Sequence, residues 1–183
     1  MLLRKKIQLY SAGLLVSLLA CAPALAQLKA GAAAPSFTAP AALAGQTYNF
    51  VLAEALKKGP VVVYFYPKAF TSGCTIEAQL FAEATDKFAA LKATVIGVSG
   101  DDIETLKKFS QGPCGGKFAV AADLDRSIIK AYDAGMLIMP SMASRISYVV
   151  TPDSKILFVH NGMNPDQHVS STLAALQAWQ AKR

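Results

Sequence analysis

The chain has 183 residues, 53% of them hydrophobic, and a formal net charge of +6, a length that suggests one domain. Its lysines are scattered with acidic residues between them, so no basic stripe indicates a nucleic-acid-binding protein. The two histidines, His160 and His168, lack metal-ligand spacing, and no Cys-x-x-Cys pair indicates a thioredoxin-type dithiol site. We therefore expect no metal ion, no cofactor and no nucleic-acid partner.

The first 26 residues differ from the rest of the chain. A basic run at residues 4–6 precedes an apolar stretch over residues 7–20, and Ala24-Leu25-Ala26 forms an Ala-x-Ala cleavage site. This order predicts a cleaved secretory signal peptide over residues 1–26, because the apolar stretch is short for a membrane span. Removing its three basic residues lowers the net charge from +6 to +3. We expect residues 27–183 to be exported, with a bacterial periplasm as their location.

A second interpretation of the same segment stays open. Leu18-Leu19-Ala20-Cys21 resembles a lipobox, in which the signal ends at Ala20 and Cys21 becomes the lipidated first residue. In that case the mature protein is anchored to a membrane by its lipid. Without the lipid we expect no membrane association.

The first half of the mature chain alternates between extended and helical patterns. Residues 27–45 are rich in alanine and indicate an extended segment, and residues 47–58 indicate a short strand and a helical turn. Val61 to Tyr66 is continuously apolar, as expected for a central strand that is covered on both faces. Apolar residues then recur at helical spacing from Cys74 to about Leu91, and Thr94 to Val98 indicates a second buried strand.

The second half repeats the alternation and closes with a hairpin and a helix. The expected elements are a helix capped by Asp101-Asp102 and ending near Phe109, a glycine-rich loop that carries Cys114, a strand over 118–121, a helix over 126–132, a hairpin of 147–151 with 155–160, and an amphipathic helix over 166–181. Strands that alternate with helices predict an α/β sandwich in a single domain.

Cys74 is the residue with the clearest chemical potential. The apolar run ends at Pro67, a polar turn with a glycine follows, and Cys74 then begins the helical pattern. A thiol at a helix N-terminus lies near unpaired backbone N–H groups and the positive end of the helix dipole, which favour the nucleophilic thiolate. We predict that Cys74 is reactive. The alternative is a buried structural thiol, because isolated buried cysteines are common.

Pro67, Thr71 and Cys74 form the pattern Pro-x-x-x-Thr-x-x-Cys, by which the chain resembles the peroxiredoxins. The run FYPKAFTSGCTIEA is similar to the active-site segment of their Q-type (bacterioferritin-comigratory) branch, and the resemblance continues from about Ala34 onward. It implies a thioredoxin-like sandwich, a central mixed β-sheet flanked by helices. It also implies a thiol-dependent peroxidase that reduces hydrogen peroxide and organic hydroperoxides through a sulfenic acid at Cys74. The reductant would be a thioredoxin-like or glutathione-type thiol donor.

The resemblance also implies roles for four further residues. The Thr71 hydroxyl would hydrogen-bond the sulfur and the peroxide, although a helix N-cap is its alternative role. Pro67 would shield the thiolate, or merely end the strand. Arg145, which falls where the family has an arginine on a distant strand, would contact the thiolate and a peroxide oxygen, with a surface ion pair as the alternative. Glu77 would orient Arg145, or else interact with the helix dipole.

Cys114 is the candidate for a resolving cysteine. Many Q-type members carry that cysteine five residues after the reactive one, where this chain has Gln79. Cys114 lies in a later loop whose glycines permit movement, and the alternatives are a structural disulfide partner or an inert thiol. If Cys114 cannot reach Cys74, the enzyme has one working cysteine and depends on an external thiol.

Two other functions remain as alternatives to a peroxidase. A non-enzymatic peroxide sensor would use the same oxidation as a signal, and a thiol-disulfide oxidoreductase would share the thioredoxin-like fold. The sequence favours catalysis because a sensor needs only a reactive cysteine, whereas Pro67, Thr71, Cys74 and Arg145 are all present. An oxidoreductase of the dithiol type is disfavoured because no second cysteine lies three residues from Cys74.

Overall fold

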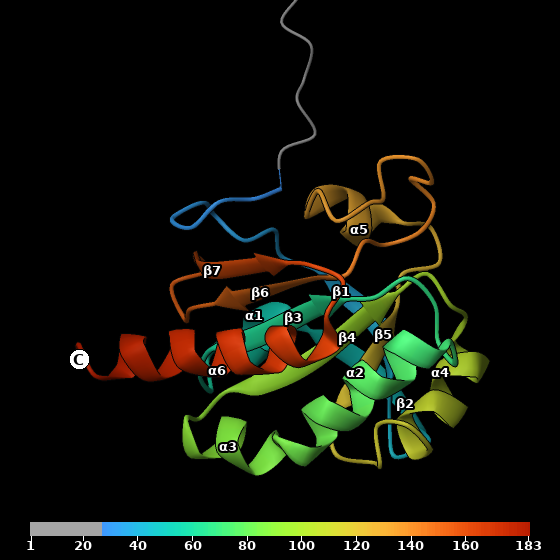
Figure 1. The fold of residues 1–183 in the computed structure, drawn as a ribbon, viewed down its shortest axis with the longest axis horizontal. Coiled ribbons are helices and arrows are strands. Elements are labelled where there is room, and N and C mark those ends of the chain that lie inside the picture. The colour runs from blue at the N-terminus through green and yellow to red at the C-terminus, as the bar shows by residue number, and fades with distance from the viewer. Residues whose placement is uncertain (1–26) are drawn as a thin grey trace, which may run out of the picture.

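The computed structural model describes residues 27–183, which form one seven-stranded sheet with helices on both faces (Figure 1). The strands are β1 (Thr38–Leu43), β2 (Gln46–Val51), β3 (Val61–Phe65), β4 (Thr94–Ser99), β5 (Ala119–Ala122), β6 (Ile146–Val150) and β7 (Ile156–Asn161). The helices are α1 (Leu52–Leu56), α2 (Ser72–Glu83), α3 (Thr85–Ala90), α4 (Ile103–Gln111), α5 (Ser127–Ala131) and α6 (Pro165–Gln180). The predicted signal peptide lies outside the described residues.

The sheet is mixed, with the strand order β2-β1-β5-β4-β3-β6-β7. β3, β4 and β5 run parallel to one another, and the other neighbouring strands pair antiparallel. All five residues of β3 are buried between β4 and β6, so the continuous apolar run is a central strand, as predicted. The fold confirms the predicted α/β sandwich with a mixed central sheet.

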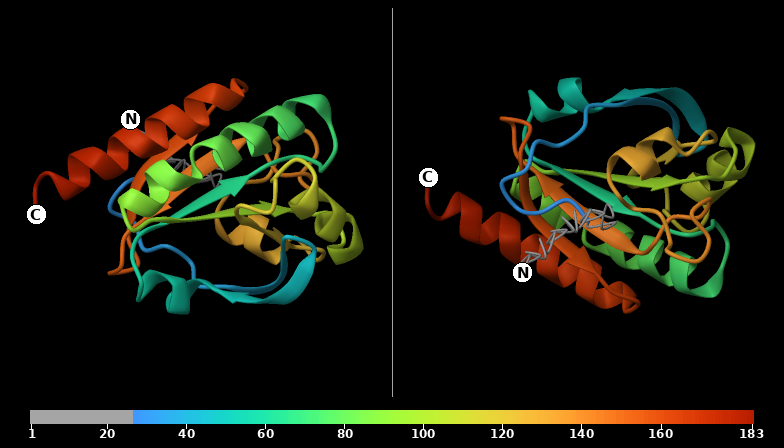
Figure 2. Two further views of the ribbon diagram at one scale, coloured as in Figure 1. Left: turned by 90° about the horizontal axis from the view of Figure 1, so that it is seen from below. Right: turned by 90° about the horizontal axis from the view of Figure 1, so that it is seen from above.

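Two apolar cores lie on the two faces of the sheet. α1 and α5 cover one face together with Phe37 and alternate residues of the strands. α2, α3, α4 and α6 cover the other face, where α2 and α6 lie side by side (Figure 2). Cys74, near the start of α2, belongs to this second core, and α2 packs against α6. This face of the sheet holds the candidate site.

The region before β2 differs from its prediction. Residues 27–45 are not simply an extended segment, because β1 is an interior strand that pairs with β2 on one side and β5 on the other. Its fully buried residues are the small Ala41 and Ala42, and Pro40 points to the exposed side. Alanine and proline are poor strand formers, so their composition conceals a strand that tertiary packing stabilises.

The helix predicted from Cys74 to Leu91 is two helices. α2 ends at Glu83 and α3 begins at Thr85, with Ala84 between them at φ −88° and ψ −1°. The Thr85 hydroxyl donates to the Phe81 carbonyl at 3.1 Å, a local bond that competes with the regular helical pattern. Phe81 and Phe88 still pack together below the break, which is why the apolar spacing continues through it.

The remaining elements agree with the prediction to within a few residues. Asp102 caps α4, because its carboxylate accepts a hydrogen bond from the Thr105 backbone N–H at 2.8 Å. Periodicity predicts Val169, Leu173, Leu176 and Trp179 on one side of the closing helix α6, where Val169 and Leu176 are buried and the other two are half-buried. No helix within residues 27–183 combines the length and the apolar character needed to cross a membrane.

Candidate active site

Cys74 is the third residue of α2 and carries a free, buried thiol. The helix begins after Thr71, whose backbone is extended at φ −74° and ψ 152°. The first backbone N–H groups of a helix have no partners within the helix, so this turn presents donors and a positive dipole end near the sulfur. The predicted position of Cys74 at a helix N-terminus is therefore observed.

Arg145 bridges the sulfur and a carboxylate. It directly precedes β6, is 5% exposed, and its Nη2 lies 3.5 Å from the Cys74 Sγ, while its Nη1 donates to the Glu77 Oε2. Gly73 permits this approach, since a Cβ at that position would lie 3.0 Å from the Arg145 Nη2. The structure thus brings together three of the predicted residues, Cys74, Glu77 and Arg145.

Thr71 and Pro67 lie at the rim of the site. The exposed Thr71 hydroxyl donates to the Lys68 carbonyl at 3.0 Å, so in this structure it neither contacts the sulfur nor caps α2 with its side chain. Pro67 is half-buried directly after Tyr66, and it lines a surface pocket of about 360 Å³ with Arg126 and Met142. The contact expected between Thr71 and the sulfur remains a prediction.

Asp101 anchors the loop that leads to Cys74. Its Oδ2 accepts from the Ala69 backbone N–H and from the Ser99 hydroxyl, each at 2.8 Å. The sequence assigned Asp101 and Asp102 together to the cap of the following helix, and only Asp102 has that role. The loop needs an anchor because Phe70, two residues before the start of α2, has φ 64°, in the left-handed region that a bulky side chain rarely adopts.

Glu77 is completely buried, and one of its oxygens has no hydrogen-bond partner. Burial raises the pKa of Glu77 to about 8, against the opposing effect of Arg145. Its Oε1 lies 3.8 Å from the Nδ1 of His168, a residue on α6 that is also completely buried. The carboxyl group therefore connects the active-site arginine to the closing helix.

His168 and Ser147 complete this buried network, and neither was predicted from the sequence to be a site residue. The His168 Nε2 lies 2.9 Å from the Gly162 carbonyl, which can only accept, so Nε2 carries the proton and Nδ1 accepts from the Ser147 hydroxyl at 2.8 Å. Burial, with smaller effects of His160 and Arg145, lowers the pKa of His168 to about 4, so the imidazole is neutral at pH 7. The spacing of His168, Thr172 and Leu176 on one helix face was the available signal.

Cys114 lies in the loop after α4 and is a second free, buried thiol. It packs in the same core as Cys74, and burial raises its pKa to about 12. The glycines beyond it, Gly115 and Gly116, have φ values of 55° and 67°. The predicted flexible-loop cysteine is therefore a core residue in this state, and it needs a rearrangement before it can meet another thiol.

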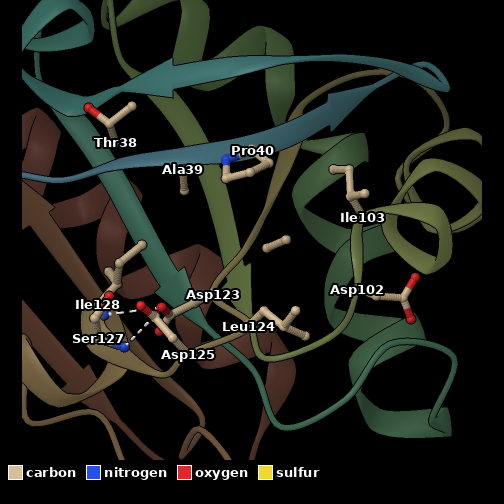
Figure 3. Close-up of a pocket in the computed structure, with 11 residues that line it drawn as sticks. Thr38, Ala39, Pro40, Asp102, Ile103, Asp123, Leu124, Asp125, Ser127 and Ile128 are labelled. Carbon is tan, nitrogen blue, oxygen red and sulfur yellow. Dashed lines mark hydrogen bonds between the residues drawn. The ribbon is translucent and has the colours of Figure 1, made fainter.

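Asp123 and Asp125, which follow β5, have structural roles. A pocket of about 430 Å³ is lined by Asp102, Asp123 and Asp125 among others, and it includes none of the predicted site residues (Figure 3). Asp123 accepts from the backbone N–H groups of Ile128 and Ile129, and Asp125 accepts from that of Ser127. Residues 27–183 contain no group of three or more His, Cys, Asp or Glu side chains arranged to hold a metal ion.

The arrangement around Cys74 suits a nucleophilic displacement. A guanidinium and a helix N-terminus stabilise negative charge on the sulfur, and the same donors can stabilise charge on an oxygen that leaves. Gly73 leaves room for the Arg145 Nη2 beside α2, and the buried Glu77 accepts a hydrogen bond from its Nη1. No second thiol lies in the same turn of α2.

Comparisons with known proteins agree on one family. Residues 30–159 match the model described as the AhpC/TSA family. The chloroplastic peroxiredoxin Q of Oryza sativa subsp. japonica is 33% identical over 152 residues, which cover 81% of this chain and 66% of the rice protein, slightly under two thirds of its length. A putative peroxiredoxin of Mycobacterium tuberculosis is 30% identical over 130 residues, covering 69% of this chain and 84% of that protein.

Solved structures show the same architecture. Peroxidoxin BcpB from Mycobacterium tuberculosis superposes with a TM-score of 0.75 at 28% identity, covering 82% of this chain and 97% of that one. Peroxiredoxin Q from Xanthomonas campestris gives a TM-score of 0.66 at 26% identity, covering 76% of this chain and 89% of that one. These matches confirm the predicted thioredoxin-like fold.

Proposed function

The chain belongs to the AhpC/TSA family, the peroxiredoxins, and from this premise we propose that it is a thiol-dependent peroxidase whose nucleophile is Cys74. Its substrates are hydrogen peroxide and organic hydroperoxides. The observation that carries the proposal is the 3.5 Å contact between the Arg145 Nη2 and the Cys74 Sγ at the start of α2. This contact gives the buried sulfur of Cys74 a cationic neighbour at a helix N-terminus.

The proposed reaction is a displacement on oxygen. The Cys74 thiolate attacks one peroxide oxygen, the sulfur–oxygen bond forms, the O–O bond breaks, and the leaving oxygen takes up a proton to become water or an alcohol. The sulfur is oxidised to a sulfenic acid, the first step of cysteine oxidation. Arg145 stabilises the thiolate before the reaction and the leaving oxygen during it.

Thr71 and Pro67 have proposed roles at the rim. The Thr71 hydroxyl is exposed and needs only a side-chain rotation away from the Lys68 carbonyl to offer a hydrogen bond to a peroxide. Pro67 covers the end of β3 without offering a backbone N–H to water. Glu77 is a positioning residue, because it contacts Arg145 and not the sulfur.

A thiol from outside or inside the chain must reduce the sulfenic acid. We infer that a thioredoxin-like or glutathione-type donor closes the cycle, and that Cys114 is the candidate for an internal first step. In the reduced structure Cys114 is completely buried with a pKa raised to about 12, so it can act only after local unfolding of its loop or of α2. Non-reducing peptide mapping tests this step: a Cys74–Cys114 link that forms only after peroxide supports it, and accumulated Cys74 sulfenic acid contradicts it.

Turnover with an external reductant tests the proposed function. The reduced protein should consume many equivalents of peroxide when a thioredoxin system is present, and Cys74→Ser should consume none, because a hydroxyl is far less acidic than a thiol. Ser72→Ala, an exposed substitution in the same turn, is the matched control and should retain the parent rate. Consumption of a single equivalent under all reducing conditions would instead indicate a peroxide sensor. Unchanged turnover in Cys74→Ser would refute the assignment.

We also propose that the protein is exported after cleavage at Ala26. The basic, apolar and Ala-x-Ala regions of residues 1–26 support this, and they lie outside the described residues. Intact mass measurement of the protein from a bacterial host tests it. A mass that begins at Gln27 supports secretion, a lipidated Cys21 supports the membrane-anchored alternative, and an uncleaved chain contradicts both.

A further inference from the structure

Around the proposed nucleophile, two acidic groups compete for one cation in a region closed to water. We propose that Cys74 and Glu77 share a single negative charge opposite Arg145, so that Glu77 is protonated while Cys74 is a thiolate and ionises when Cys74 becomes a neutral sulfenic acid. This inference rests on the proposed peroxidase function and deepens it. It makes Glu77 a redox-linked proton donor in addition to a positioning residue.

Burial and geometry limit the charge of this cluster. The side chain of Arg145 is 5% exposed, that of Glu77 is 0% exposed, and Cys74 is 2% exposed. The guanidinium divides its contacts, with Nη1 on the Glu77 Oε2 and Nη2 on the Cys74 Sγ. If both acids were ionised, one buried cation would neutralise only half of the negative charge. An uncompensated buried charge is strongly unfavourable, and two acids that share a site ionise one at a time.

Within residues 27–183, the ionisable side chains around Glu77 supply no second positive charge. The ionisable groups that the described residues place around Glu77 are Cys74 on its own helix, Tyr64 on β3, Arg145 before β6 and His168 on α6. Burial raises the pKa of Tyr64 and lowers that of His168 to about 4, so both are neutral at pH 7. The pKa of Glu77, raised to about 8 by burial, agrees with a carboxyl group that retains its proton.

Two histidines, His168 and His160, lie beyond the unpaired oxygen of Glu77. The Glu77 Oε1 has no hydrogen-bond partner, and the acceptor Nδ1 of His168 lies 3.8 Å from it. The His168 ring packs edge-on against His160, with 4.6 Å between ring centroids. His160 belongs to the edge strand β7 and is half-buried, and its Nε2 has no partner within the described residues. These contacts place His168 and His160 next to one another beyond the Glu77 Oε1, and within the described residues no hydrogen bond joins Glu77 to His168 or His168 to His160.

The shared charge changes the proton balance of the reaction. Attack by the thiolate on a peroxide releases hydroxide or alkoxide, which takes one proton from the medium. If Glu77 releases one proton in the same step, the protein and the product together take up none. With Glu77 replaced by a neutral side chain, the reaction must take up one proton for each sulfenic acid formed. A later disulfide with Cys114 does not change this count, because a sulfenic acid and a thiol condense to a disulfide and water.

Proton counting with a pH indicator in weakly buffered solution tests the inference. The reduced protein is mixed at pH 7 with one equivalent of hydrogen peroxide in a stopped-flow instrument, and the protons taken up are divided by the Cys74 oxidised. We expect a value near zero for the parent and near one for Glu77→Gln. Glu83→Gln, an exposed glutamate on the same helix, is the matched control and should keep the parent value. A value near one for the parent overturns the shared charge.

Two measurements on the parent protein keep the test independent of whether Glu77→Gln folds. Proton uptake should rise from near zero at pH 7 towards one above pH 8, where Glu77 is already ionised, and a count of one at every pH contradicts the proposal. Infrared difference spectra should lose a protonated-carboxyl band when peroxide is added, and a spectrum without that loss also contradicts it. Protein that consumes no peroxide refutes the peroxidase function itself, whereas peroxide consumption with one proton per sulfur refutes only the shared charge.

His160→Phe tests whether the two histidines carry the proton that Glu77 releases. The count should stay near zero, while proton release should become slower than sulfenic acid formation. A release rate equal to that of the parent removes the two histidines from the route.

Discussion

Cys74 and Cys114 are both free thiols that are closed to solvent and packed in the same apolar core, yet their surroundings differ in charge. Cys74 lies in the first turn of α2 beside Arg145, whereas Cys114 follows the C-terminal end of α4 and has no charged partner among its hydrogen bonds. Burial alone raises the pKa of Cys114 to about 12. A cation and a helix N-terminus, the two features that favour a reactive thiolate, therefore distinguish the proposed nucleophile from Cys114.

The two helix ends contribute opposite fields to the two sulfurs. The N-terminus of α2 offers unpaired N–H groups and the positive end of the dipole to Cys74. Gln111 ends α4, so Cys114 lies beyond the negative end of that dipole. The two sulfurs therefore lie at helix ends of opposite polarity, and only Cys74 also contacts Arg145.

Removing the planar guanidinium of Arg145 should make Cys74 less reactive towards peroxide, and so more similar to Cys114. Arg145→Lys keeps a positive charge but cannot contact the Cys74 sulfur and the Glu77 carboxyl group together. We expect the rate of peroxide reduction to fall by about 100-fold or more, as with the loss of one donor to a developing oxyanion. Stopped-flow peroxide kinetics measure it, with Arg126→Lys as the control because Arg126 bonds only backbone carbonyls. Equal rates for Arg145→Lys and the parent would assign the stabilisation to another group.

The sequence predicted the position of Cys74 at a helix start better than it predicted the distant residues that pack around Cys74. A strand, a proline, a polar turn and a helical pattern follow one another within residues 61–77, so local signals located the helix start. The contact with Arg145 joins residues 71 positions apart, and only the family resemblance indicated it. His168 was missed because periodicity places it on the buried face of α6 without showing that this face meets Glu77. The position of Cys114 in a loop after α4 was predicted, but its burial was not, because local glycines do not reveal long-range packing.

The polar network of Glu77, His168 and Ser147 is buried close to Cys74. Acid should destabilise the fold by protonating His168. His168 has a pKa lowered to about 4 in the fold, against 6.5 in an unfolded chain, so it favours the folded state above pH 6.5. That contribution is lost as the pH falls from 6.5 towards 4, at about 1 kcal/mol per pH unit. Urea unfolding across this pH range should show that the free energy of unfolding decreases less for His168→Gln than for the parent. The same pH slope in variant and parent would contradict a neutral buried imidazole.

Because Cys114 lies in a mainly apolar core, a more polar side chain at this position should destabilise the fold. Cys114→Ser buries a hydroxyl group in a mainly apolar core, so the free energy of unfolding should fall by about 2 kcal/mol. Cys114→Ala removes the sulfur without adding a polar group and serves as the control. Urea unfolding of both variants decides it. A serine variant as stable as the alanine variant would mean that the loop rearranges or that water reaches residue 114.

The close approach of Arg145 to α2 should depend on Gly73. A Cβ there lies 3.0 Å from the Arg145 Nη2, so Gly73→Ala should displace the guanidinium by a few tenths of an ångström and slow peroxide reduction about tenfold. Gly112→Ala is the matched control, because its Cβ meets only the Lys108 carbonyl at 3.5 Å. Peroxide kinetics on the two variants should differ. Equal rates would show that the arginine tolerates the added methyl group.

Chemical trapping after one equivalent of hydrogen peroxide tests the contrast between the two sulfurs most directly. The folded, reduced protein is oxidised in the presence of dimedone, digested without reduction and mapped by mass spectrometry. We predict that every oxidised peptide contains Cys74, either as the dimedone adduct or in a disulfide with Cys114. Peroxide consumption with unmodified Cys74, or a dimedone adduct on Cys114, would contradict the assignment of Cys74 as the nucleophile.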